Sequence, residues 1–188
     1  QEGQAQDFRV LPLTVRFGSE EFRDGIDLDH DAFYARLVSA TELPKTSQIT
    51  PEAFDRAFCE ELRDPTNEVL CITGSSKLSG TFQSAQLAKE LSGYDEIYIV
   101  DSQQALCGLR MLVDFACVLR DEGLSAREIA EQVESASHRV RLFGIVNTLE
   151  YLHKGGRLPA SMGGVGRLLK VKPLITLREG EVGSLGKG

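Results

Sequence analysis

Apolar residues recur along this chain in two patterns, continuous short runs typical of strands and spaced positions typical of helices. The runs predict strands over Val10–Gly18, Glu68–Thr73, Glu96–Ser102 and Arg141–Val146. The second and third runs are nearly all apolar instead of alternating, so we expect helices to cover both of their faces.

Helix signals separate the predicted strands. Asp29 and Thr50 can each cap a helix, over residues 30–40 and from Pro51 to about residue 63. A third helix is predicted after Gly80. The apolar spacing assigns core-facing side chains to the first and third of these helices: Phe33, Leu37 and Val38, and then Leu78, Phe82, Ala85, Ala88 and Leu91.

Two more helices are predicted further along the chain. One covers residues 103–122 and ends at Gly123, and the other covers 126–138, where Ser125-x-x-Glu128 has the form of a capping box. Alternating strands and helices are typical of an α/β fold with a parallel sheet between two helix layers.

The composition changes near residue 140, where the chain becomes rich in Gly and basic residues. We therefore divide it into an N-terminal α/β domain, residues 1–139, and the start of a second domain, residues 140–188. The segments PLITL and EVGSLGK predict two strands of that second domain, joined by a turn at Glu179-Gly180.

Charge and cysteine content narrow the function class. The net charge of −7 argues against nucleic acid or an anionic membrane as a partner. No apolar run reaches the roughly 18 residues of a spanning helix, so we expect no stable membrane insertion. The four cysteines lack CxxC spacing, which argues against a zinc or redox motif. Three of them, Cys71, Cys107 and Cys117, lie in apolar surroundings and are expected to be buried thiols.

Ligands of doubly wound sheets bind beyond the carboxyl ends of the strands, and three loops qualify: Lys45–Thr50, Gly74–Thr81 and Asp101–Gln104. The Gly74–Thr81 loop is the richest, because Ser79 and Thr81 bring hydroxyls to a helix N-terminus that suits an anion. Gly80 there permits a close approach to the backbone. The alternative is that Ser79 only caps the helix.

Two other segments are candidates for holding an anion. Thr46, Ser47 and Gln48 lie in the polar loop before a helix, and an ordinary loop is the alternative for them. Arg157 follows a Gly-Gly pair and can bind a carboxylate or phosphate through two N–H groups, unless it is a solvated surface residue. It belongs to a basic run that can face an acidic partner or simply water: Lys154, Arg157, Arg167, Lys170, Lys172 and Arg178.

Several catalytic signatures are missing, namely GxSxG, HExxH and a full GxGxxG. The residues therefore favour binding of an anionic head group over turnover.

The segments PLTVRFG, EFRDGIDLD, LPKTSQIT, ITGSSKLSGTFQSA, IVDS, LEYLHKGGRL and LLKVKPLITL occur in this order. Together they resemble the DegV family of bacterial fatty-acid-binding proteins. The resemblance implies a three-layer α/β/α domain with a parallel sheet and a second, smaller α/β domain with a mixed sheet. It also implies a long-chain fatty acid such as palmitate in an internal tunnel, with no metal and no cofactor.

The resemblance places the fatty-acid carboxylate on Thr46 and Ser79, with lesser roles for Ser47, Gly80, Thr81 and Arg157. It implies a binding protein and not an enzyme, which presents the carboxylate to a partner fatty-acid kinase for acyl-phosphate formation. We expect a cytoplasmic monomer. Family chains carry an earlier first strand and a longer second domain, so we expect this sequence to lack both ends.

Two other functions stay open. The fold also resembles the substrate-binding half of dihydroxyacetone kinases, so the loops can hold a small triose-like metabolite. A regulatory or scaffold protein that uses the basic run is the other alternative.

Overall fold

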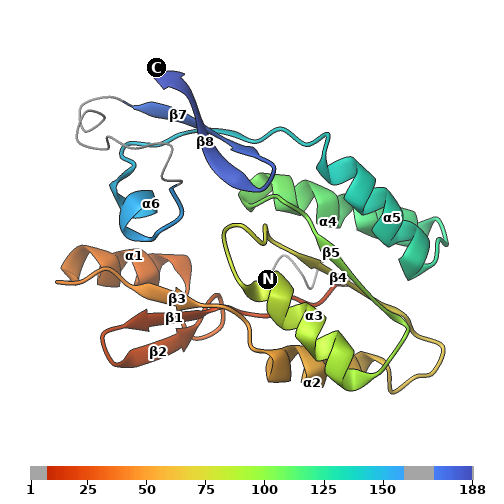
Figure 1. Ribbon diagram of the computed structural model, residues 1–188. Coiled ribbons are helices and arrows are strands. Elements are labelled where there is room, and N and C mark those ends of the chain that lie inside the picture. The colour runs from red at the N-terminus through yellow and green to blue at the C-terminus, as the bar shows by residue number, and fades with distance from the viewer. Residues whose placement is uncertain (1–7, 159–171, 188) are drawn as a thin grey trace.

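The computed structural model describes residues 8–158 and 172–187 (Figure 1). Its elements, in chain order, are β1 (Thr14–Phe17), β2 (Glu20–Arg23), α1 (His30–Ser39), β3 (Lys45–Ser47), α2 (Pro51–Glu61), β4 (Val69–Thr73), α3 (Thr81–Ser92), β5 (Ile97–Asp101), α4 (Leu106–Asp121), α5 (Ala126–Ser137), β6 (Phe143–Ile145), α6 (Glu150–Lys154), β7 (Pro173–Arg178) and β8 (Glu181–Lys187).

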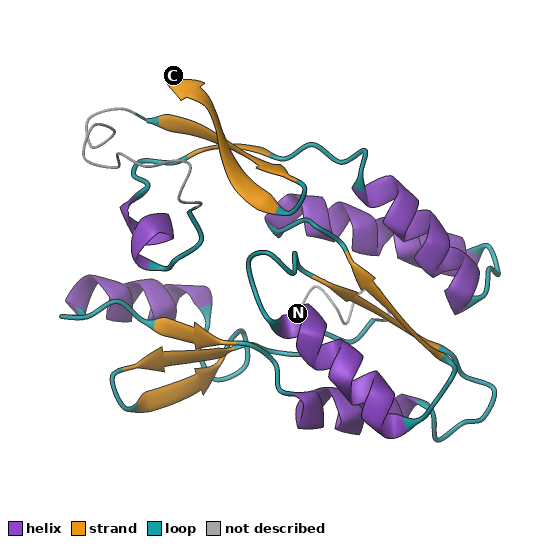
Figure 2. Cartoon of the chain, viewed as in Figure 1, coloured by secondary structure: helices purple, strands orange, loops and turns teal. Residues whose placement is uncertain are grey.

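A parallel pair of strands, β4 and β5, forms the centre of the three-layer part of the fold. Successive side chains along each strand point to opposite faces of this pair. One face packs on α2 and α3 through Val69, Cys71, Ile97 and Ile99. The opposite face packs on α4 and α5 through Leu70, Ile72 and Val100. Figure 2 shows the two helix layers on either side of the strands, which confirms the predicted α/β/α arrangement.

The first strands form a separate antiparallel sheet in the order β2-β1-β3. The strand expected over Val10–Gly18 is limited to β1, and the segment Lys45–Thr50, predicted as a loop, begins with β3. Pairing with β1 explains this difference, because Lys45 to Ser47 gain a partner strand that their own composition does not reveal. Helix α1 covers the sheet, with the Phe33 ring 5.8 Å from the Phe17 ring.

The second antiparallel sheet has the order β6-β7-β8, and its β7–β8 turn lies at Glu179-Gly180 as predicted. Its inner face forms a third apolar cluster with the loop before α3 and with α6: Leu78, Ala105, Leu142, Leu152, Leu158, Ile175, Leu177 and Val182. The chain enters this sheet after α5 ends at Ser137. The domain boundary at residues 139–140 stays a prediction.

Three of the side chains that were expected to face the core do not pack where they were predicted. Val38 is 88% exposed and Leu91 is 72% exposed, so neither faces the core. Helix α1 has no buried residue, and Leu91 lies in the last turn of α3, beyond the buried stripe of that helix. That stripe in α3 consists of Thr81, Ser84, Ala85 and Ala88, small residues that let the helix approach the sheet closely. Leu78 precedes α3 and packs in the third cluster instead.

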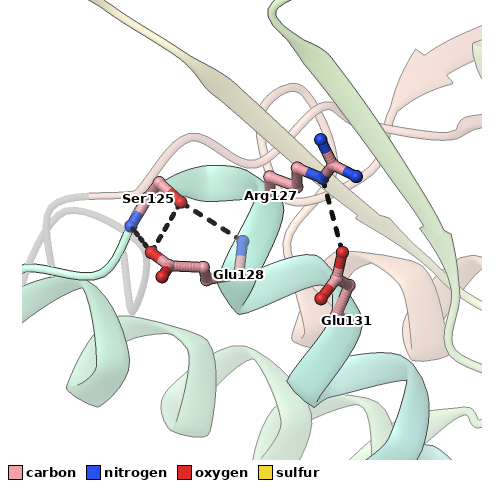
Figure 3. Close-up of polar contacts among 4 residues, drawn as sticks. All are labelled: Ser125, Arg127, Glu128 and Glu131. Carbon is pink, nitrogen blue, oxygen red and sulfur yellow. Dashed lines mark hydrogen bonds and ion pairs between the residues drawn. The ribbon is translucent and has the colours of Figure 1, made fainter.

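Helix starts follow their capping residues. Ser125 accepts from the Glu128 N–H and Glu128 reaches back to the Ser125 N–H, so the predicted capping box of α5 is present (Figure 3). An ion pair between Arg127 and Glu131 lies one turn along. Helix α4 starts at Leu106 and not at residue 103. Gln103 and Leu106 both have positive φ values, +51° and +52°, so the chain is not in the regular right-handed helical conformation before Cys107.

The cysteines are free thiols with different exposure. Cys59, Cys71 and Cys117 are half-buried, and Cys107 is exposed on the outer side of α4, contrary to the expectation that it is buried. Burial raises the pKa of the Cys71 thiol to about 12. Among the helices of the described residues, none has the length and apolar character needed to cross a bilayer.

We predict that Ser125→Ala lowers the free energy of unfolding by about 1 kcal/mol, because it removes the cap of α5. Urea unfolding followed by circular dichroism measures the change. Ser135→Ala, at an exposed position inside the same helix, is the control and should be neutral or slightly stabilising. Equal losses for the two variants would show that the cap contributes nothing.

We also predict that an alkylating reagent at pH 8 modifies Cys107 in the native protein and leaves Cys71 unmodified. The raised pKa keeps the Cys71 thiol protonated at that pH, and only a thiolate reacts. Peptide mapping by mass spectrometry reads the result, and urea should make both sites reactive. Labelling of native Cys71 as fast as Cys107 would contradict the raised pKa of this thiol.

Candidate functional site

The loop that follows β4 is tied to the loop that follows β5. The Ser75 N–H donates to the Gln104 carbonyl oxygen at 2.9 Å, and the Ser76 N–H donates to the Asp101 carboxylate at 3.1 Å. Two carboxyl-end loops, Gly74–Thr81 and Asp101–Gln104, therefore meet, as expected for neighbouring parallel strands.

Ser79 and Thr81 bring two hydroxyls together at the N-terminus of α3. Their oxygens lie 2.8 Å apart, and the Thr81 N–H donates to Ser79 Oγ at 3.3 Å. Gly80 occupies the cap position, and no side chain caps the helix. The first turn of α3 thus points its N–H groups and the positive end of its dipole toward this hydroxyl pair.

Gln48 connects the segment after β3 to the same helix turn. Its Nε2 donates to Ser84 Oγ at 2.7 Å. The amide lies directly over Gly80, so that a Cβ at position 80 would collide with the amide oxygen and carbon of Gln48. The loop candidates before α2 and before α3 are therefore in contact.

Thr46 and Ser47 lie on the exposed edge strand β3. Thr46 is opposite Val15 on β1, a residue only 4% exposed, so both side chains are on the sheet face that α1 partly covers. Thr46 is nevertheless exposed, since β3 is at the end of the sheet. Ser47 is opposite Thr14 and faces the other way.

Arg157 reaches the loop from the segment after α6. Its Nε donates to the Leu78 carbonyl oxygen at 3.1 Å, and a terminal nitrogen donates to the Gly155 carbonyl oxygen at 2.6 Å. The guanidinium is exposed. It therefore supports the backbone one residue before Ser79 and adds positive charge beside the hydroxyl pair.

The rest of the basic run is dispersed. Lys154 is paired with Glu150 at 2.6 Å, and Lys172 and Arg178 are exposed. Arg167 and Lys170 lie outside the described residues.

Ser75 also belongs to the site, but nothing in the sequence indicates its role. It is 1% exposed, and its Oγ donates to the Gly180 carbonyl oxygen at 2.7 Å, which joins the loop before α3 to the β7–β8 turn. Figure 1 shows the loop reaching the tip of that hairpin. Gly180 has φ +82° and leaves no room for a side chain against Ser75. The positive φ values of the turn are predictable from Glu179-Gly180, but its long-range partner is not.

A second place for a ligand lies away from the hydroxyl pair. A depression of about 440 Å³ lies at the far end of α3, lined by Gln86, Lys89, Glu90, Gly93, Tyr94, Asp95 and Ile99. A helix of that length separates it from Ser79 by about 18 Å. Within the described ranges, no group of three or more His, Cys, Asp or Glu side chains is placed to hold a metal ion.

Comparison with known proteins assigns the chain to a family. A family model described as "Uncharacterised protein, DegV family" matches residues 1–188. The chain belongs to the DegV family. A DegV domain-containing protein of Caldanaerobacter subterraneus is 34% identical over 178 residues, which are 95% of this chain and 63% of that protein. This DegV chain therefore spans less than two-thirds of that relative's length.

Solved DegV structures share the fold. One is described as showing the fatty-acid binding of a DegV family protein from Thermus thermophilus; it is 34% identical, with a TM-score of 0.87 over 98% of this chain and 65% of that one. The fatty acid kinase (Fak) B3 protein of Streptococcus pneumoniae, solved loaded with linoleic acid, is 27% identical. Its TM-score is 0.83 over 96% of this chain and 64% of that one.

We predict that Ser75→Ala lowers the free energy of unfolding by about 1–3 kcal/mol, because it leaves the Gly180 carbonyl without its donor in a buried place. Thermal or urea unfolding measures this loss. Ser76→Ala is the matched control, since Ser76 bonds through its backbone N–H and should be nearly unaffected. The hairpin contact would be unimportant if the two serine variants lost the same stability.

Proposed function

We propose that this protein binds a long-chain fatty acid, with the carboxylate at the N-terminus of α3. The observation that carries the proposal is the pair of hydroxyls on Ser79 and Thr81, 2.8 Å apart at a helix start without a side-chain cap. Hydroxyl and backbone donors stabilise a carboxylate that would otherwise be costly to remove from water.

In this proposal two residues hold the carboxylate directly, and the other site residues contribute less. Ser79 and Thr46 donate to the carboxylate from two different elements, and Thr81 and Ser47 are neighbouring hydroxyls of lesser weight. Gly80 lets the ligand and the loop approach closely. Arg157 supplies positive charge from the side, because two of its N–H groups are already bonded to backbone carbonyls.

The acyl chain would extend from the hydroxyls into the third apolar cluster. Leu78, one residue before Ser79, packs in that cluster with side chains of the second sheet and of α6. Each buried CH₂ contributes about 0.8 kcal/mol, so a chain of about 16 carbons supplies most of the affinity. We propose that an internal tunnel encloses it, as the likeness to fatty-acid-loaded relatives supports.

A kinase is the proposed partner. The structural relative loaded with linoleic acid is named as part of a fatty acid kinase system. We infer that the present protein performs no chemistry itself and presents the carboxylate to a separate kinase for acyl-phosphate formation. Neutral hydroxyl donors suit this role, because they leave the carboxylate more nucleophilic than a close ion pair would. The protein would act as a monomer in the cytoplasm, where its four thiols stay reduced.

We predict that Ser79→Ala and Thr46→Ala each weaken palmitate binding about tenfold, the effect of losing one hydrogen bond to a charged group. Isothermal titration calorimetry measures the affinity, and hexadecanol, which has no carboxylate, should be affected much less. Ser19→Ala, at an exposed turn, is the control. The proposal fails if the protein binds no C14–C18 acid, or if both variants bind palmitate as the unmodified protein does.

A further inference from the structure

The side chain of Gln48 is the direct link between β3 and α3. Within the described residues, its hydrogen bond to Ser84 is the only one from a side chain of residues 45–48 to α3. Ser84 is 3% exposed, and its N–H donates to the Gly80 carbonyl oxygen at 3.0 Å. Gln48 therefore holds the first turn of α3, the turn that begins with Thr81.

The other support for Thr46 comes from its neighbours: β3 pairs with β1, and Ile49 packs in the apolar cluster that includes Ala85 and Ala88 of α3. Strand β3 is three residues long, it lies at the edge of its sheet, and all three of its residues are exposed. Burial of the side chains of β3 itself therefore does not fix where the Thr46 hydroxyl lies relative to Ser79. A carboxylate held by both hydroxyls needs that spacing to be fixed, because hydrogen bonds weaken steeply when distance or angle departs from the preferred range.

We propose that Gln48 is a positioning residue, which locks the Thr46 hydroxyl against the N-terminus of α3 so that both loops hold one fatty-acid carboxylate. The inference rests on the proposed function. It also assigns a reason to Gly80: any side chain at this position would displace the Gln48 amide, so the two residues form one interlocked unit.

The backbone at Gly80 makes the interlock testable. Gly80 has φ −75° and ψ 6°, a turn conformation with negative φ that does not require glycine. The close contact for an added methyl group is with the Gln48 amide. Gly80→Ala should therefore be harmful when Gln48 is present and tolerated when position 48 is alanine.

The experiment measures dissociation constants for palmitate and hexadecanol by calorimetry. The set is the unmodified protein, Gln48→Ala, Gly80→Ala and the double variant, with Gln132→Ala as a control at an exposed glutamine of α5. Each single variant should weaken palmitate binding about tenfold, and the double variant should be no weaker than Gln48→Ala alone. Hexadecanol binding should change little in all of them, and the urea midpoint should fall by no more than the loss of one side-chain hydrogen bond to Ser84 explains.

Three results would overturn the positioning role. Unchanged palmitate affinity in Gln48→Ala removes it directly. Losses that multiply in the double variant show that Gly80 acts independently of Gln48. Equal losses for palmitate and hexadecanol, with a lowered urea midpoint, indicate a merely structural contribution. Absence of palmitate binding by the unmodified protein would instead overturn the proposed function, and this inference with it.

Discussion

The loop between β4 and α3 must satisfy its own buried backbone groups, and within it only Ser79 Oγ bonds an N–H of the first turn of α3, that of Thr81. The structure meets this requirement with neighbours from distant parts of the chain. Asp101 and Gln104 bond the backbone of the loop from below, Ser75 joins it to the β7–β8 turn, and Arg157 bonds the Leu78 carbonyl. These contacts keep the loop in place without using the helix N-terminus, so that an anion can use it.

Local rules predicted much of the fold. Caps at Asp29, Thr50 and Ser125 marked three helix starts, and apolar runs located β4 and β5, because these signals depend on neighbours along the chain. Strand β3 was missed, since Lys45–Ser47 is entirely polar and becomes a strand only through pairing with β1. The β-propensity of a segment does not reveal such pairing with a distant strand.

The residues of the candidate site likewise fall into those that the sequence could indicate and those that it could not. Ser79, Gly80 and Thr81 could be found because hydroxyls and a glycine cluster at a helix start after a buried strand. Ser75 could not, because its partner is 105 residues away in sequence, and Gln48 was found only as a member of the Thr46–Gln48 loop, since its partner Ser84 is 36 residues away. The two interpretations of Ser79 both stay open: Gly80 occupies the N-cap position, and the Ser79 hydroxyl pairs with that of Thr81 while it also accepts from the Thr81 N–H.

The pairing of β3 with β1 also determines which chemical group lies on the sheet face that α1 partly covers. In the observed register Thr46 is opposite Val15, and a slip of one residue would bring Lys45 or Ser47 to that face instead. An all-polar strand has no hydrophobic pattern to resist such a slip. The choice between a neutral hydroxyl and an ammonium group at this edge is therefore made by strand alignment, and a single amide bond to Ser84 is placed to keep that alignment.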